Sequence, residues 1–275
     1  MAKMTMVQAI NLALKQEMDK DDRVLVLGED VGTDGGVFRV TNELIDKYGE
    51  ERVIDTPLAE TAIIGTSVGM ALFGLRPVCE IQFSGFSYMA FHQLENHAAR
   101  LRGRSCGRFH VPLVVRMPYG GGVRALEHHS ESREVYYAHT PGIKMVIPSS
   151  PRNARALLIS AIRDPDPVVF CELKESDGVN AEIIDLQTIS PMDHSAFSES
   201  VKKTGRAVVV HEAPRSFGVA AEIAARLVEK SLLYLEAPVK RVTGFDVPIP
   251  LFQKEKVYLP GVARIIKAAR QTLDF

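Results

Sequence analysis

The stretch RVLVLGED at residues 23–30 decides the fold, because it is a short, continuous apolar run that stops at a glycine followed by two acids. Such a run is typical of a parallel strand that is buried on both faces. Ligands in open α/β sheets bind outside the carboxyl ends of the strands. The stretch therefore predicts a helix-covered parallel sheet, and it places Glu29 at the edge where a site would form.

The same pattern recurs through the first two thirds of the chain. Thr5 is placed to cap a helix that extends to about Asp19. Further strands are expected at 53–55, 77–83, 111–117, 144–147 and 168–172, and helices at 41–48 and 60–74. Alternation of strands and helices predicts an α/β fold with a mostly parallel, helix-covered sheet.

A second, smaller α/β unit follows the first. Its strands are expected at 182–186, 206–210 and 239–242, and its helices at 218–230 and 262–273. We therefore divide the chain into residues 1–174 and residues 175–275.

Composition excludes several classes of protein. The chain has 275 residues and a formal net charge of −1, so nothing favours nucleic acid or an anionic membrane as partner. The three cysteines, Cys79, Cys106 and Cys171, are far apart in the sequence and fit a reducing compartment. The first residues lack the features of a signal peptide, and no apolar run approaches the length that spans a bilayer. We expect a cytoplasmic protein.

Two titratable residues are the first candidates for chemistry. Glu60 follows a turn and opens a helix, where an acid is also favoured simply by the helix dipole. His129 and its neighbour His128 lie in a polar segment after the glycine loop at 119–122, and polar histidines in loops are better site candidates than histidines on apolar faces.

An ordered set of motifs carries a family resemblance. The motifs are GEDVG (28–32), DTPLAE (55–60), EIQF (80–83), EHHSES (127–132), PGIK (141–144) and EAPVKRVTG (236–244). In this order they resemble the beta subunit of the decarboxylating component of thiamine-diphosphate-dependent 2-oxo acid dehydrogenases, the pyruvate and branched-chain enzymes. The resemblance spans nearly the whole chain. It implies a pyrimidine-type thiamine-diphosphate-binding domain followed by a transketolase C-terminal-type domain.

The resemblance also implies roles for individual residues. Glu60 would bind the aminopyrimidine ring nitrogen of thiamine diphosphate, and burial would raise the pKa of its carboxyl group so that it can share a proton. Phe86 would lie against the pyrimidine face, although an arbitrary phenylalanine is more often a core residue. Leu58 and Gln82 would line the same pocket. His129 would be the catalytic residue near the substrate carboxylate and the lipoyl group.

A structural potassium ion is a further implication of the resemblance. Its oxygen ligands would come from one residue on a strand and from the segment AIRDPD, which are Leu113, Ala161, Ile162, Asp164 and Asp166. A helix end followed by an Asp-Pro turn explains the same segment equally well without a metal.

The motif Gly-Asp-Gly, through which the family holds magnesium and the diphosphate, does not occur in the sequence. The resemblance therefore implies that a separate alpha subunit supplies this half of each site, in an alpha2beta2 heterotetramer docked on a dihydrolipoamide acyltransferase core with its lipoyl domain. The activity would be oxidative decarboxylation of pyruvate or a branched-chain 2-oxo acid, with reductive acylation of the lipoyl group. The beta chain alone would be inactive. The alternatives are an acetoin dehydrogenase beta subunit and a non-catalytic scaffold subunit of the same fold.

The chain departs from the family between Glu172 and Ala181. Relatives have several dozen residues here, which supply a linker and the first strand and helix of the C-terminal domain. A parallel sheet that loses an inner strand would expose apolar faces and unpaired edges. We therefore doubt a natural deletion and expect that residues are missing between Lys174 and Ala181.

Overall fold

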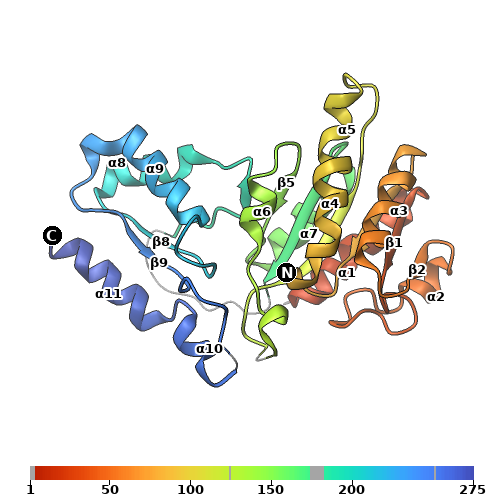
Figure 1. Cartoon of the computed structure of the whole chain (residues 1–275), viewed down its shortest axis with the longest axis horizontal. Helices are drawn as coiled ribbons and strands as arrows, with labels where there is room; N and C mark the ends of the chain where they lie inside the picture. Colours follow the sequence, from red (N-terminus) through yellow and green to blue (C-terminus); the bar gives the residue numbers. More distant parts are fainter. Residues whose placement is uncertain (1–3, 124, 174–182, 251) are drawn as a thin grey trace.

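In the computed structural model, residues 4–123, 125–173, 183–250 and 252–275 are described. Two units lie side by side, a larger one built on a wide sheet and a smaller one built on a narrow sheet (Figure 1). The predicted α/β class is confirmed, because both sheets carry helices on their faces.

The larger sheet has seven strands in the order β2-β1-β3-β4-β6-β5-β7. All neighbouring strands are parallel except β7, which runs antiparallel to β5. The strands are β1 (Val24–Gly28), β2 (Val53–Asp55), β3 (Arg76–Glu80), β4 (Val114–Tyr119), β5 (Lys144–Val146), β6 (Val168–Leu173) and β7 (Thr188–Ser190). Because β1 to β4 are parallel, their carboxyl ends lie along one edge of the sheet.

Two layers of helices cover this sheet (Figure 1). On one face, α1 (Met6–Lys20) packs against α7 (Pro151–Arg163), and a capping box at Thr5 starts α1 as predicted. On the other face lie α3 (Glu60–Leu72), α4 (Tyr88–Gln93), the π-helical turn η2 (Leu94–Ala98) and α5 (Ala99–Arg104). Two short helices, α2 (Leu44–Tyr48) and α6 (Glu134–Ala138), complete the unit.

Alternation along β1 shows how both faces are filled. Val24 and Val26 point into the core beneath α1 and α7, whereas Leu25 and Leu27 point into the core beneath α3 and α4. All four side chains are buried. The continuous apolar run at 24–27 is therefore the mark of a strand covered on both sides.

A charged triad interrupts the apolar face beneath α1 and α7. Arg116 on β4 pairs with Glu80 on β3 and with Glu172 on β6, and its Nη2 donates to Glu172 Oε2 over 3.0 Å. All three side chains are buried. Burial alone would lower the pKa of Arg116, but the carboxylates of Glu172 and Glu80 outweigh burial and raise that pKa above its ordinary value. The triad ties three neighbouring strands together near their carboxyl ends.

The smaller unit has a parallel pair of strands, β8 (Val208–Val210) and β9 (Lys240–Val242), within the described residues. Helices α8 (His194–Thr204) and α9 (Val219–Ser231) cover one side of the pair, and α11 (Val262–Leu273) covers the other (Figure 1). The turn η4 (Leu232–Tyr234) follows α9, and α10 (Phe252–Tyr258) precedes α11. The helices predicted at 218–230 and 262–273 are confirmed.

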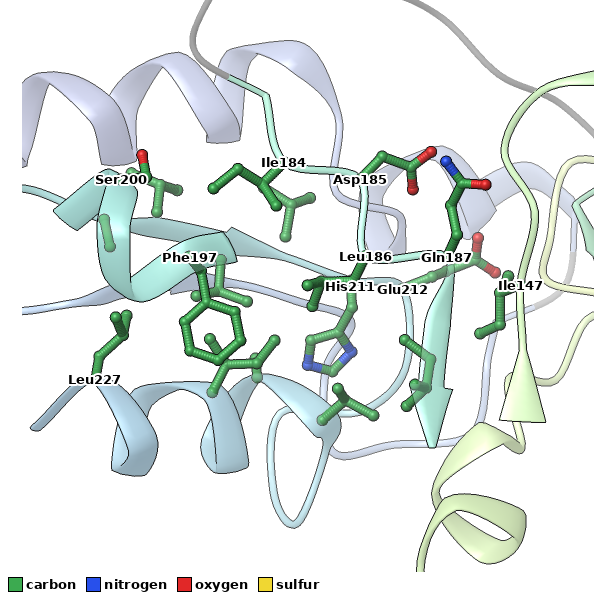
Figure 2. A pocket seen from close by; sticks show the side chains of 18 of the residues that line it. Ile147, Ile184, Asp185, Leu186, Gln187, Phe197, Ser200, His211, Glu212 and Leu227 are labelled. Carbon is green, nitrogen blue, oxygen red and sulfur yellow. The ribbon is translucent and has the colours of Figure 1, made fainter. Parts of the chain in front are cut away.

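The strand predicted at 182–186 is wrong for the described residues 183–186, which are neither strand nor helix. A strand forms instead at β7, which pairs with β5 of the larger sheet. The physical reason is that a strand needs a neighbour, and a cavity separates residues 184–187 from β8. This cavity has a volume of about 360 Å³, and Phe197 and Leu227 reach into it from α8 and α9 (Figure 2).

Candidate functional site

Acidic side chains gather where β1 ends and α3 begins. Glu60 is the first residue of α3 and is half-buried. The pKa of Glu29 is raised by burial and then by the nearby carboxylates of Asp30 and Glu60. Gln82, which follows β3, donates from Nε2 to Asp30 Oδ2 over 3.2 Å. The structure thus brings the predicted residues Glu60 and Gln82 to one edge of the sheet, as the parallel arrangement of β1 and β3 requires.

A cluster of aromatic and imidazole rings adjoins these acids. The ring of His129 lies 4.6 Å from that of Phe83 and 5.1 Å from that of Phe86, edge to face in both cases. His128 lies 5.4 Å from Phe86 and 4.4 Å from His129, and Phe38 packs on Phe83. Phe83 is buried, whereas Phe86 and His129 are half-buried. The predicted residues Phe86 and His129 therefore meet, although 43 positions separate them in the sequence.

Gly85 makes this meeting of rings feasible. It lies in the 3-10 turn η1 (Ser84–Ser87), and the turn η3 (Glu127–His129) packs directly on it. A Cβ atom at this position would be 1.9 Å from the carbonyl oxygen of His128. Ser84 Oγ also donates to the carbonyl oxygen of Glu131, which fixes the histidine segment from its far end.

An exposed apolar rim borders the same edge. Leu58, which was predicted to line the cofactor pocket, is 73% exposed. Met89, Tyr88 and Leu126 are also exposed, and Thr61 Oγ1 donates to the carbonyl oxygen of Met89, which joins the start of α3 to α4. Exposed apolar groups of this size, next to polar ones, are typical of a surface that another chain covers.

The glycine loop at 119–122 is held by acids that sequence reasoning did not single out. The amide of Gly121 donates to Glu212 Oε1, and the amide of Gly122 donates to Glu255 Oε1 over 2.9 Å. Both acids come from the smaller unit, Glu212 after β8 and Glu255 on α10. Glu212 carries a signal similar to that of Glu29, because it is an acid two residues after an apolar strand. Glu255 sits in an ordinary amphipathic helix and gives no signal.

Beneath this loop lies a buried group of titratable side chains. The hydroxyl of Tyr119 donates to Glu134 Oε2 over 2.8 Å, and His211 Nδ1 lies 4.0 Å from Glu134 Oε1. Burial raises the pKa of Glu134 to about 7, and burial followed by the charge of Arg241 lowers the pKa of His211 to about 4. Both side chains are therefore mostly uncharged at slightly acidic pH.

The predicted potassium ligands lie together at the end of α7, but cationic side chains already contact several of their oxygens. Lys144 Nζ donates to both carboxylate oxygens of Asp164 over 2.7 Å, and Arg102 Nη1 donates to Asp166 over 2.6 Å. Arg76 Nη1 donates to the carbonyl oxygen of Ile162 over 2.7 Å.

The two remaining carbonyl oxygens of the predicted set accept from the backbone. The carbonyl oxygen of Leu113 accepts from the amide of Val168, and that of Ala161 accepts from the amide of Asp164. In this conformation a potassium ion would have to displace Lys144 and Arg76. The cation site therefore remains a prediction.

The donor set at the sheet edge fits the aminopyrimidine half of thiamine diphosphate. A half-buried carboxyl group at Glu60 can face a ring nitrogen, and the half-buried ring of Phe86 can offer a face for stacking. The glycine loop, by contrast, uses two of its amides on Glu212 and Glu255. This loop is therefore not free to bind a diphosphate through those amides.

Among the described residues, no helix is long and apolar enough to cross a membrane.

Comparison with known proteins agrees with this geometry. The family model described as "Transketolase, pyrimidine binding domain" matches residues 2–177, and "Transketolase, C-terminal domain" matches residues 169–265. A solved structure described as "Split gene transketolase, inactive beta4 tetramer" superposes with a TM-score of 0.79 at 16% identity and covers 99% of each chain. At that identity the likeness concerns the fold.

Curated relatives are much closer in sequence. The pyruvate dehydrogenase E1 component subunit beta of Bacillus subtilis (strain 168) is 44% identical over 325 residues and covers 100% of each chain. That of Acholeplasma laidlawii is 44% identical and covers 98% of each chain. The 3-methyl-2-oxobutanoate dehydrogenase subunit beta of Mycobacterium tuberculosis (strain ATCC 25618 / H37Rv) is 43% identical and covers 98% of this chain and 92% of that protein. The chain therefore belongs to the family of 2-oxo acid dehydrogenase E1 beta subunits, built from transketolase-type pyrimidine-binding and C-terminal domains.

Proposed function

We propose that this chain is the beta subunit of a thiamine-diphosphate-dependent 2-oxo acid dehydrogenase, and that it supplies the aminopyrimidine half of each active site. The observation that carries the proposal is the contact between Phe86 and His129 at the edge of the parallel sheet where Glu60 begins α3, in the family to which the chain belongs. The reaction would be oxidative decarboxylation of a 2-oxo acid with acyl transfer to a lipoyl group.

Thiamine diphosphate, when bound, supplies the electron sink that lets a 2-oxo acid lose carbon dioxide. Glu60 would hold a proton at the aminopyrimidine ring nitrogen, and Phe86 would orient that ring by stacking. The imidazole of His129 would exchange a proton with the substrate or with the incoming lipoyl group, because histidine titrates near neutral pH. The edge contacts from Phe83 and Phe86 would hold this imidazole in place.

An alpha-type subunit would cover the exposed rim formed by Leu58, Tyr88, Met89 and Leu126. It would also bring magnesium and the groups that bind the diphosphate. The position of the rim supports this division: Leu58 lies two residues before Glu60, and Met89 accepts a hydrogen bond from Thr61 at the start of α3. The arrangement of an alpha2beta2 heterotetramer on an acyltransferase core follows from the family.

The preferred 2-oxo acid is pyruvate or a branched-chain 2-oxo acid. Relatives of nearly equal similarity are a pyruvate dehydrogenase subunit at 44% identity and a 3-methyl-2-oxobutanoate dehydrogenase subunit at 43%. Assay of both substrates by the assembled enzyme decides between them.

The test is decarboxylation by this chain mixed with an alpha subunit, thiamine diphosphate and magnesium. We expect activity in the mixture and none from the chain alone. Glu60→Gln keeps the size of the side chain but cannot hold the proton, so kcat should fall by about 10²- to 10⁴-fold. Glu50→Ala, at an exposed acid before β2, is the matched control and should keep full activity. Normal turnover by Glu60→Gln with the cofactor bound contradicts the proposal.

A further inference from the structure

The histidine segment, residues 121–132, has both of its ends on one carboxylate of the smaller unit. The amide of Gly121 donates to Glu212 Oε1, and the hydroxyl of Ser132 donates to the same oxygen over 3.4 Å. The turn η3, which carries both histidines, lies between these two contacts. Glu212 therefore closes the segment into a loop whose position depends on where the smaller unit lies.

The backbone of Glu212 is fixed on both sides. The amide of His211 donates to the carbonyl oxygen of Val242 over 3.1 Å, and the amide of Gly244 donates to that of Ala213 over 3.0 Å. These bonds continue the pairing of β8 with β9 past the ends of both strands. A Cβ atom at Gly244 would be 2.5 Å from the carbonyl oxygen of Glu212, so the two segments also pack closely. The carboxylate thus projects from a well-held part of the smaller unit.

Glu212 is well suited to hold a backbone segment. A hydrogen bond from an amide to a carboxylate is charge-assisted and roughly twice as strong as one between neutral groups. Both contacts of Glu212 are partly buried, so loss of this acceptor would leave the amide of Gly121 unpaired where water reaches it poorly. Glu255 accepts from the amide of Gly122 over 2.9 Å and reinforces the first end. Of these two acids, Glu212 is the one that bonds to both ends.

The larger unit contacts the same segment through η1 and its neighbour Phe83. The ring of His129 lies 4.6 Å from that of Phe83 and 5.1 Å from that of Phe86. Ser84 Oγ donates to the carbonyl oxygen of Glu131, one residue before the second end. These contacts locate the imidazole against η1, whereas the two ends set the path of the chain that leads to it. The place of the imidazole therefore depends on both units.

We propose that Glu212 is a positioning residue, through which the smaller unit holds His129 in place for the reaction. The inference rests on the proposed function, because His129 is a reacting group there. It gives the smaller unit a part in catalysis, although Glu60, Phe86 and His129 all belong to the larger unit.

The first measurement uses the full chain and no activity. Hydrogen exchange is followed at the amides of His129 and Ser130, which form the hydrogen bonds of the turn η3. Glu212→Ala should speed exchange at both amides by about tenfold or more, because the turn opens more often when its ends are released. Amides on α1 should not change. Glu229→Ala, at an exposed acid of α9, is the matched control and should leave all of these amides unchanged.

The second measurement is acylation of a lipoyl domain by the assembled enzyme. A shift of about 1 Å in a reacting group can cost on the order of 10²-fold in rate, so Glu212→Ala should lower kcat by about 100-fold. KM for the 2-oxo acid should change by less than about threefold, because Glu60 and Phe86 lie outside the segment. Glu212→Gln keeps an oxygen that can accept from Gly121, and its kcat should stay within about tenfold of that of the unmodified chain.

Ser132→Ala tests the hold on the second end. It should lower kcat less in the Glu212→Ala chain than in the unmodified chain, because the hydroxyl then has no carboxylate to reach. Equal losses in the two chains overturn the hold from both ends.

Unchanged exchange in Glu212→Ala overturns the inference, as does faster exchange with an unchanged kcat. A KM that rises as far as kcat falls also overturns it, since that result indicates general damage to the site. If circular dichroism shows that Glu212→Ala does not fold, Glu212→Gln decides: faster exchange with a lower kcat supports the inference, and no change in either overturns it. Full activity of Glu60→Gln contradicts the proposed function separately, because exchange at η3 does not depend on activity.

Discussion

Replacing Gly85 by alanine should displace the histidine segment, because the new side chain would overlap the backbone of His128. The new Cβ atom would lie 1.9 Å from the carbonyl oxygen of His128, whereas ordinary contact begins at 3.4 Å. The segment must therefore withdraw by about 1.5 Å, the difference between those two distances. The neighbour of His128 is His129, the proposed catalytic histidine, so the displacement reaches the reacting groups directly.

A misplacement of about 1 Å can cost on the order of 10²-fold in rate. We therefore expect Gly85→Ala to lower kcat for acylation of a lipoyl domain by about 100-fold or more in the assembled enzyme. KM for the 2-oxo acid should change less. Gly103→Ala is the matched control, because Gly103 is an exposed residue of α5 with no neighbour near its Cβ position. That variant should retain full activity.

Circular dichroism and assembly with the alpha subunit distinguish a local shift from misfolding. If Gly85→Ala folds, assembles and turns over like the unmodified chain, then the contact between η1 and the histidine segment does not position His129, and the reasoning is refuted.

Other consequences of the structure can be measured separately. Arg116→Met should destabilise the chain by about 3–5 kcal/mol in urea unfolding, because Glu80 and Glu172 would remain buried without their partner; an unchanged midpoint contradicts this. Phe86→Leu should weaken thiamine diphosphate binding by about three- to tenfold in a calorimetric titration; equal affinity would remove the stacking role. Glu134 has a folded pKa of about 7, above its ordinary 4.5, so its contribution to stability is present below pH 4.5 and lost as pH rises through 7. Between pH 4.5 and 8 the free energy of unfolding of Glu134→Gln should therefore rise by about 3 kcal/mol relative to that of the unmodified chain. If the two chains lose or gain stability in parallel over this range, the pKa of Glu134 is not raised.

Much of the larger unit could be predicted because each of its strands is a local apolar run. Strands and helices at 6–20, 24–28, 53–55 and 60–72 depend on residues that are close in sequence, such as the capping box at Thr5 that begins the first of them. Their carboxyl ends carry acids and polar residues, which is why Glu60 and Gln82 could be placed at one edge. The antiparallel strand β7 could not be placed, since it pairs with β5 across more than 40 residues of sequence and no local pattern reports such a contact.

The candidate site was predicted only as far as its residues follow strands of the larger unit. Phe86 and His129 meet because η1 and η3 pack together, and motifs suggested this meeting. Glu212 and Glu255 reach the glycine loop from a different unit, and no local pattern reports a contact between segments about 90 and 130 residues apart. Contacts of that kind are a property of how the two units are docked.

The antiparallel strand β7 lies beyond the predicted boundary at residue 174 and yet belongs to the larger sheet. The chain thus adds a strand to the larger sheet before the smaller unit begins. The two units are therefore joined by strand pairing as well as by the connecting chain. A protease that cuts between residues 173 and 183 should leave both fragments associated through the pairing of β7 with β5. A nicked sample would run as one species in native gels and as two in denaturing ones. The domain that the family model defines and the part of the chain that folds as one body would then differ.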